Sequence, residues 1–131
     1  MILSARMVQV VGRRWHALLL AACVLFLLEH AANAHAIILS SVPPAGGTVK
    51  GSDVGVQLHF NSRIDRQRSK ILLISADGKE TPMPLDAKST DDTLVGRTQG
   101  VAPGEYRLRW QVLSIDGHIT RGDIAFTVVA P

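Results

Sequence analysis

Apolar and polar residues alternate over short segments of this chain, and this period of two most constrains what it can fold into. Val54, Val56, Leu58 and Phe60 alternate with polar residues or glycine, and Tyr106–Val112 repeats the pattern. Successive side chains of an extended chain point to opposite faces, so each segment is predicted to be a half-buried strand. No stretch of about ten or more residues carries the 3.6-residue apolar stripe of an amphipathic helix.

The pattern predicts about seven strands, at 36–41, 54–60, 71–74, 80–85, 94–98, 106–112 and 124–128. Asp77-Gly78 marks a hairpin turn, and Pro82 and Pro84 confine their segment to a sheet edge. Short strands separated by turn residues are typical of an all-β Greek-key sandwich or barrel, of Ig-like or cupredoxin-like type. Tyr106 follows the turn Pro103-Gly104-Glu105, which favours either a tyrosine corner or a core tyrosine with its hydroxyl at the surface.

Residues 1–34 have the composition of a secretory signal peptide. Three arginines precede an unbroken run of twelve apolar residues, Ala17 to Leu28, and Ala32-Asn33-Ala34 offers the small residues that a signal peptidase requires. The run is shorter than the about 20 apolar residues that span a bilayer. We therefore predict cleavage after Ala34, which leaves one domain of residues 35–131 in the periplasm. The alternative is an uncleaved N-terminal anchor.

Removal of this leader changes the charge and the thiol content of the chain. The remaining 97 residues carry 11 Lys and Arg against 10 Asp and Glu, because three of the 14 basic residues lie in the leader. This near-neutral balance gives no reason to expect a nucleic-acid partner. The only cysteine, Cys23, also lies in the leader. The mature domain therefore cannot contain a disulfide, a Cys-rich zinc site or a blue-copper centre.

Three histidines remain, and His35 differs from the other two because cleavage would make it the first residue. Its α-amine and its ring Nδ1 could then chelate one metal ion in a six-membered ring. The ordinary pKa of such an amine is about 7.7–8.0, so the affinity should rise with pH. A cut after Ala36 would instead discard this ligand. His59 is expected to be a surface histidine, because it lies on the outward parity of its strand.

Asp116-Gly117-His118 offers partners for His35. Residues i and i+2 of an extended segment share a face, so the Asp116 carboxylate and the His118 imidazole could meet at one ion. Gly117 allows a tight turn between two strong strands. A polar turn without metal is the alternative interpretation of this triplet.

The donor types indicate the metal. An amine, two imidazoles and a carboxylate suit tetragonal Cu(II), and the Irving–Williams order favours Cu(II) over Zn²⁺ on such a set. Cu(I) prefers sulfur ligands, and Met83 is the only sulfur of residues 35–131.

Three segments of the sequence resemble the CopC family of periplasmic copper-resistance and copper-trafficking proteins. They are His35-Ala36 with Ser40-Ser41-Val42-Pro43, Pro103-Gly104-Glu105-Tyr106 with Trp110, and Ser114–His118 with Gly122–Phe126. The resemblance spans essentially all of residues 35–131. It implies a Greek-key fold and a Cu(II) site made of His35 (amine and ring), Asp116 and His118.

The sequence also departs from the family pattern. Some members have a Met-rich loop for Cu(I), which this chain lacks between Lys70 and Gly100. Some have an acidic residue just beyond the strand that ends at Phe60, where this chain has Asn61-Ser62-Arg63. The resemblance therefore implies a single Cu(II) site, and a CopD-type inner-membrane copper protein as a separate partner.

The function expected from these observations is that of a periplasmic Cu(II) carrier or buffer without catalytic activity. One alternative is a metal-free β-sandwich for adhesion or assembly. The other is a small histidine-brace copper monooxygenase, for which 97 residues leave little area to bind a polysaccharide.

Overall fold

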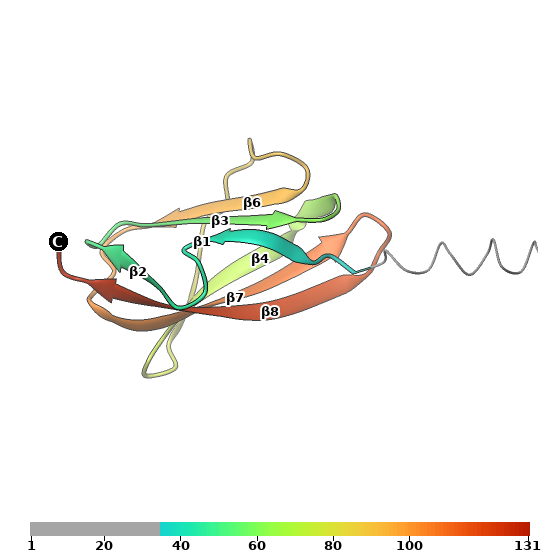
Figure 1. The fold of residues 1–131 in the computed structure, drawn as a ribbon. Coiled ribbons are helices and arrows are strands. Elements are labelled where there is room, and N and C mark those ends of the chain that lie inside the picture. The colour runs from blue at the N-terminus through green and yellow to red at the C-terminus, as the bar shows by residue number, and fades with distance from the viewer. Residues whose placement is uncertain (1–34) are drawn as a thin grey trace, which may run out of the picture. The chain divides into compact units, whose positions relative to one another are not determined.

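The computed structural model describes residues 35–131. The predicted signal peptide and its cleavage after Ala34 concern residues outside this range. The described chain contains eight strands in two sheets and no helix (Figure 1). The smaller sheet has the order β1-β3-β6, made of Ile38–Val42, Val54–Phe60 and Thr93–Thr98. The larger sheet has the order β2-β8-β7-β4-β5, made of Gly47–Lys50, Ile119–Val129, Gly104–Ser114, Ile64–Ser75 and Glu80–Pro82.

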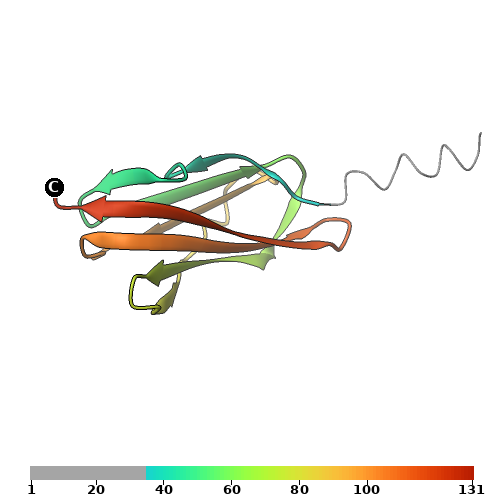
Figure 2. The ribbon, with the colours of Figure 1, turned by 60° about the horizontal axis from the view of Figure 1, so that its bottom comes forward.

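Consecutive strands repeatedly change sheet, which gives the Greek-key connections that the turn spacing predicts. The chain passes from the smaller to the larger sheet between β1 and β2, between β3 and β4 and between β6 and β7. All neighbouring strands pair antiparallel except β2 and β8, which run parallel. Figure 2 shows β8, β7 and β4 side by side in the larger sheet. The predicted all-β sandwich is therefore confirmed.

The core lies between the two sheets and is filled by the predicted inward residues. Val54, Val56, Leu58 and Phe60 of β3 are each at most 2% exposed. The ring of Phe60 meets Trp110 of β7 edge-on, with ring centroids 5.4 Å apart, a preferred geometry for aromatic pairs. The period-two pattern therefore identified the buried face of these strands correctly.

Tyr106 forms the tyrosine corner. Its hydroxyl donates a hydrogen bond to the carbonyl oxygen of Ala102 at 2.8 Å. Its ring stacks on Phe126 with centroids 5.9 Å apart. The hydroxyl thus secures the turn that precedes β7, as in other Greek-key sandwiches.

Two strands differ from the sequence prediction. The strand β2 (Gly47–Lys50) was not expected, because Val49 is its only large apolar residue and its pairing with the distant β8 gives no local pattern. The strand β4 begins at Ile64 rather than Ile71, across an irregularity between Asp65 and Lys70.

The side chain of Ser69 explains how this polar part of β4 stays in the sheet. Its hydroxyl donates to the carbonyl oxygen of Asp65 at 2.6 Å and accepts from the amide of Leu113 in β7 at 3.3 Å. A side chain therefore replaces main-chain pairing where the register shifts. The other strand ends move by a few residues, and β5 lies at a sheet edge, as Pro82 and Pro84 of the predicted segment 80–85 indicate.

Within residues 35–131, no helix is long and apolar enough to cross a bilayer.

Gly122 provides a test of the core packing. It pairs with Trp110, and a methyl group on Gly122 would lie 2.5 Å from the indole Cζ2. Gly122→Ala is therefore expected to lower the free energy of unfolding by about 1–3 kcal/mol, the usual cost of overpacking, measured by urea denaturation. Gly55→Ala is the matched control, because a methyl group there would meet nothing within 4 Å. Equal stability of the two variants would contradict this packing.

Candidate metal centre

The first part of the candidate site is the segment that leads into β1. His35 is exposed, whereas the next residue, Ala36, is only 1% exposed and belongs to the core. Ile37 forms two hydrogen bonds with Asn61, the residue that follows β3. The amide of Ile37 donates to Asn61 Oδ1 at 2.8 Å, and the amide of Asn61 donates to the Ile37 carbonyl at 2.9 Å. The position of His35 is therefore set by the contacts of the two residues that follow it, Ala36 and Ile37.

The second part is the tight turn between β7 and β8. The amide of Ser114 donates to the carbonyl of His118 at 2.8 Å, and the amide of Gly117 donates to the carbonyl of Ser114 at 2.9 Å. Gly117 has φ of +91°, in the left-handed region that glycine enters without strain. The backbone of this turn therefore favours glycine between Asp116 and His118, as the sequence predicts.

The fold brings these two parts together. The ring centroids of His35 and His118 are 5.8 Å apart, with an angle of 34° between the ring planes. The Asp116 Oδ1 atom lies 3.3 Å from Nδ1 of the His118 ring. The start of β1 and the β7–β8 turn lie at the same end of the sandwich in both views (Figures 1 and 2). His118 therefore lies beside each of the other two predicted site residues.

These separations can be compared with the needs of a metal ion. Two donors in adjacent positions on one ion, each bound at about 2.0–2.1 Å, lie about 3 Å apart. The carboxylate–imidazole separation of 3.3 Å is close to this value. Two imidazoles that share an ion have centroids about 4.5–6 Å apart for the same bond lengths, which includes the 5.8 Å between His35 and His118. Within residues 35–131, no three His, Cys, Asp or Glu side chains converge closely enough to form a finished metal site.

The carboxylate of Asp116 is held in its ionised form. The main-chain amide of His118 donates to Asp116 Oδ1 at 3.2 Å and is the main reason why the pKa of this carboxyl lies below its ordinary value. The His118 side chain lowers the pKa further, while desolvation opposes both effects. The side chains of Asp116 and His118 are 42% and 54% exposed. The site is therefore an anionic, solvent-accessible turn.

His59 lies outside this site. Its Nε2 is 3.2 Å from Asp92 Oδ2, and both side chains are 40% exposed. The hydroxyls of Thr90 and Thr93 also bind this carboxylate, at 2.8 and 3.0 Å, and they are the main causes of its lowered pKa. His59 is thus a surface histidine with a protein partner, as its parity predicts.

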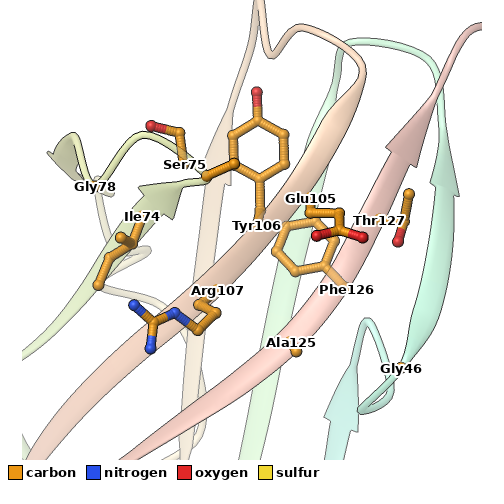
Figure 3. Close-up of a pocket in the computed structure, with 11 residues that line it drawn as sticks. Gly46, Ile74, Ser75, Gly78, Glu105, Tyr106, Arg107, Ala125, Phe126 and Thr127 are labelled. Carbon is orange, nitrogen blue, oxygen red and sulfur yellow. The ribbon is translucent and has the colours of Figure 1, made fainter.

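The candidate site also lies away from the hollow shown in Figure 3. This hollow of about 440 Å³ is lined by the start of β7 and the end of β8, around Tyr106 and Phe126. The Asp116–His118 turn joins the opposite ends of the same two strands. The predicted ligands are thus displayed on a rim rather than enclosed in a cavity.

Sequence reasoning missed the role of Asn61. It identified Asn61-Ser62-Arg63 only as a place where acidic residues of the family are lacking. The structure shows that Asn61 binds the segment ahead of β1, and that the carbonyl of Arg63 accepts a bond from the amide of Ile115 at 3.3 Å. An asparagine directly after a strand was the only local signal for this role.

The fold and the exposed histidines define a small β-sandwich with a cluster of nitrogen and oxygen donors at one end. A comparison with protein-family models matches the CopC domain over residues 38–129. The chain therefore belongs to the CopC family, as the sequence motifs indicate.

Similar proteins support this assignment. The crystal structure of CopC from Methylosinus trichosporium OB3b is 28% identical, with a TM-score of 0.65 over 73% of this chain and 95% of that one. PcoC from Escherichia coli, described as a methionine-rich copper resistance protein, is 25% identical, with a TM-score of 0.60 over 73% of this chain and all of that one. Protein YobA from Escherichia coli K12 is 26% identical over 98 residues, which cover 72% of this chain and 79% of YobA.

The lowered pKa of Asp116 predicts how this residue affects stability. A carboxyl whose pKa is lower in the folded state than its ordinary value of 3.8 stabilises the fold fully above that value, and the contribution disappears as the pH falls through the folded value. The difference in unfolding free energy between the metal-free wild-type domain and Asp116→Asn should therefore shrink on acidification from about pH 6 to about pH 2. Urea denaturation across this range measures it, and a difference that stays constant or grows would contradict the assignment.

Proposed function

We propose that this protein, once processed to begin at His35, binds one Cu(II) ion in the periplasm and acts as a copper carrier or buffer in copper resistance or uptake. The observation that carries the proposal is the 5.8 Å separation of the His35 and His118 rings, which come from opposite ends of the domain's sequence. Membership of the CopC family and the copper-resistance role named for PcoC support it.

The burial of Ala36 supports a chain start at His35. At 1% exposure, Ala36 is part of the hydrophobic core. Cleavage after Ala36 would remove a core residue as well as the histidine. Cleavage after Ala34 leaves the core complete and adds an α-amine next to the imidazole of His35.

The proposed ligands are the amine and ring nitrogen of His35, the imidazole of His118 and the carboxylate of Asp116. The amine and the ring of His35 belong to one residue, so they form a chelate without any further folding. His118 and Asp116 already have the 3.3 Å separation of adjacent ligands. Three nitrogens and one oxygen suit the tetragonal geometry that Cu(II) prefers.

The burial of Met83 favours Cu(II) over Cu(I). Met83 is the only sulfur of residues 35–131, and it is 5% exposed in the core. Its sulfur packs against Gly96, where an added methyl group would come within 2.8 Å. The thioether is thus enclosed by the sandwich, and residues 35–131 offer no exposed sulfur that could bind Cu(I).

The position of the site on a rim supports transport rather than catalysis. Ligands that are about half exposed can be reached by a second protein that receives the ion. The family resemblance implies a CopD-type inner-membrane copper protein as this partner. We accordingly propose a carrier that performs no reaction of its own.

Ligand substitutions test the proposal. Four ligands of a bound metal together contribute about 10–16 kcal/mol, so His35→Ala and His118→Ala should each weaken Cu(II) binding by about a hundredfold. Competition titration of the processed domain measures this affinity. His59→Ala is the matched control and should bind as tightly as the wild type, because His59 pairs with Asp92.

The amine is tested separately by a fusion partner without histidines, joined directly ahead of His35. The intact fusion should bind Cu(II) about a hundredfold more weakly than the same protein after cleavage restores the free amine. Equal affinity before and after cleavage would refute the ligand set.

The melting temperature of the wild-type domain tests the metal-free alternative. A bound ligand at a thousand times its Kd stabilises the folded state by about 4 kcal/mol, so a melting temperature that does not change when Cu(II) is added would support that alternative.

Asp116→Asn distinguishes a direct ligand from a residue that orients His118. Loss of a direct carboxylate ligand should weaken Cu(II) binding and also change the electron paramagnetic resonance spectrum of the bound ion, because an equatorial oxygen is replaced. A weaker affinity with an unchanged spectrum would mean that Asp116 acts through His118.

A further inference from the structure

Asn61 begins a connection that contacts both halves of the candidate metal centre, the segment ahead of β1 and the β7–β8 turn. It is the first residue of the short connection from β3 to β4, formed by Asn61, Ser62 and Arg63. On one side, Asn61 makes the two hydrogen bonds with Ile37. On the other side, the carbonyl of Arg63 accepts the amide of Ile115, next to Asp116. One three-residue connection therefore contacts both segments that carry the predicted ligands.

The bond from Ile37 to the Asn61 side chain is the only one of these three contacts that depends on a side chain. The other two join main-chain atoms, and any residue at position 63 and any residue but proline at position 61 could make them. The Ile37 amide lies ahead of β1, which begins at Ile38, so it is outside the ladder that pairs β1 with β3. The carboxamide oxygen of Asn61 thus extends the attachment of the chain beyond the end of the sheet.

Burial of Ala36 completes this attachment. Its side chain enters the core, while its neighbour Ile37 is 60% exposed and relies on hydrogen bonds rather than packing. His35 directly precedes Ala36, and the centroid of its ring lies 5.8 Å from that of the His118 ring. The segment ahead of β1 is held by one small apolar side chain, one main-chain hydrogen bond and one side-chain hydrogen bond, so it depends strongly on each of them.

We propose that Asn61 is a positioning residue of the metal centre, whose side-chain oxygen holds the Ile37 amide and so keeps the amine and ring of His35 at the Asp116–His118 turn. The inference rests on the proposed function, because it assigns a cause to the affinity of that same site. Asn61 itself does not bind the ion. It reduces the conformational freedom that His35 loses when copper binds.

The test compares two substitutions at position 61 in the processed domain. Asn61→Ala removes the acceptor and should weaken Cu(II) binding about tenfold, the lower end of the effect of residues that orient metal ligands. Asn61→Asp keeps an oxygen at the same place and should bind at least as tightly as the wild type. Competition titration with Cu(II) measures both, and hydrogen exchange of the Ile37 amide in the metal-free domain should be faster in Asn61→Ala only.

A control at the other end of the sandwich separates positioning from general stability. Ser75→Ala removes a side-chain hydrogen bond to Asp77 in the turn between β4 and β5. This variant loses one exposed side-chain hydrogen bond, as Asn61→Ala does, yet its affinity for Cu(II) should equal that of the wild type. If Asn61→Ala also binds copper like the wild type while its Ile37 amide exchanges faster, the inference is wrong and the proposed function stands.

The outcome for the wild-type domain keeps the two proposals apart. If the processed wild-type domain does not bind Cu(II), the proposed function fails, whatever the variants do. If the wild type binds and Asn61→Asp binds as weakly as Asn61→Ala, the carboxamide acts through something other than its acceptor oxygen, and the positioning role is refuted.

Discussion

The antiparallel pairing of β7 with β8 is the interaction on which the rest of the structure depends. The ladder runs from Gly104 and Val128 at one end to Leu113 and Ile119 at the other. Its inner face contributes a large share of the core, and its register places Gly122 against the indole of Trp110. The ladder also fixes where the chain reverses, because the turn that closes it must follow directly. The position of Asp116 and His118 is thus a consequence of strand register.

The other half of the candidate centre, His35, is held in place by fewer contacts. The chain ahead of β1 is held by the burial of Ala36 and by the hydrogen bonds between Ile37 and Asn61. These contacts lie at the edge of the smaller sheet, where main-chain pairing ends. His118 is therefore carried by a hairpin, and His35 by the short segment ahead of β1. This difference suits the proposal that a cut in the chain makes His35 the first residue of the site.

The electrostatics of the site agree with the proposed role of binding and later releasing a cation. Asp116 is ionised and about half exposed, so it attracts a cation without enclosing it. Sulfur is absent from the surface of residues 35–131, because Met83 is buried. Nitrogen and oxygen donors on an open rim suit the proposed Cu(II) ligation and leave room for a partner to approach.

The sequence by itself determined the fold class and the buried face of β3, and it predicted the residues of the candidate centre. These features depend on local patterns: the alternation from Val54 to Phe60, the turn chemistry of Gly117 and the motifs shared with the CopC family. Cleavage after Ala34 remains a prediction, since it concerns residues outside the described range. The identity of the metal likewise follows from donor chemistry and stays a proposal.

Only the tertiary structure decided which distant segments meet. It added β2, which pairs with a strand far along the chain and has no alternation of its own. It extended β4 through a polar segment in which the hydroxyl of Ser69 replaces main-chain bonds. It also brought His35 to His118 and gave Asn61 a partner. Such contacts depend on register and on how the two sheets pack, and neither leaves a periodic signal in the residues that make them.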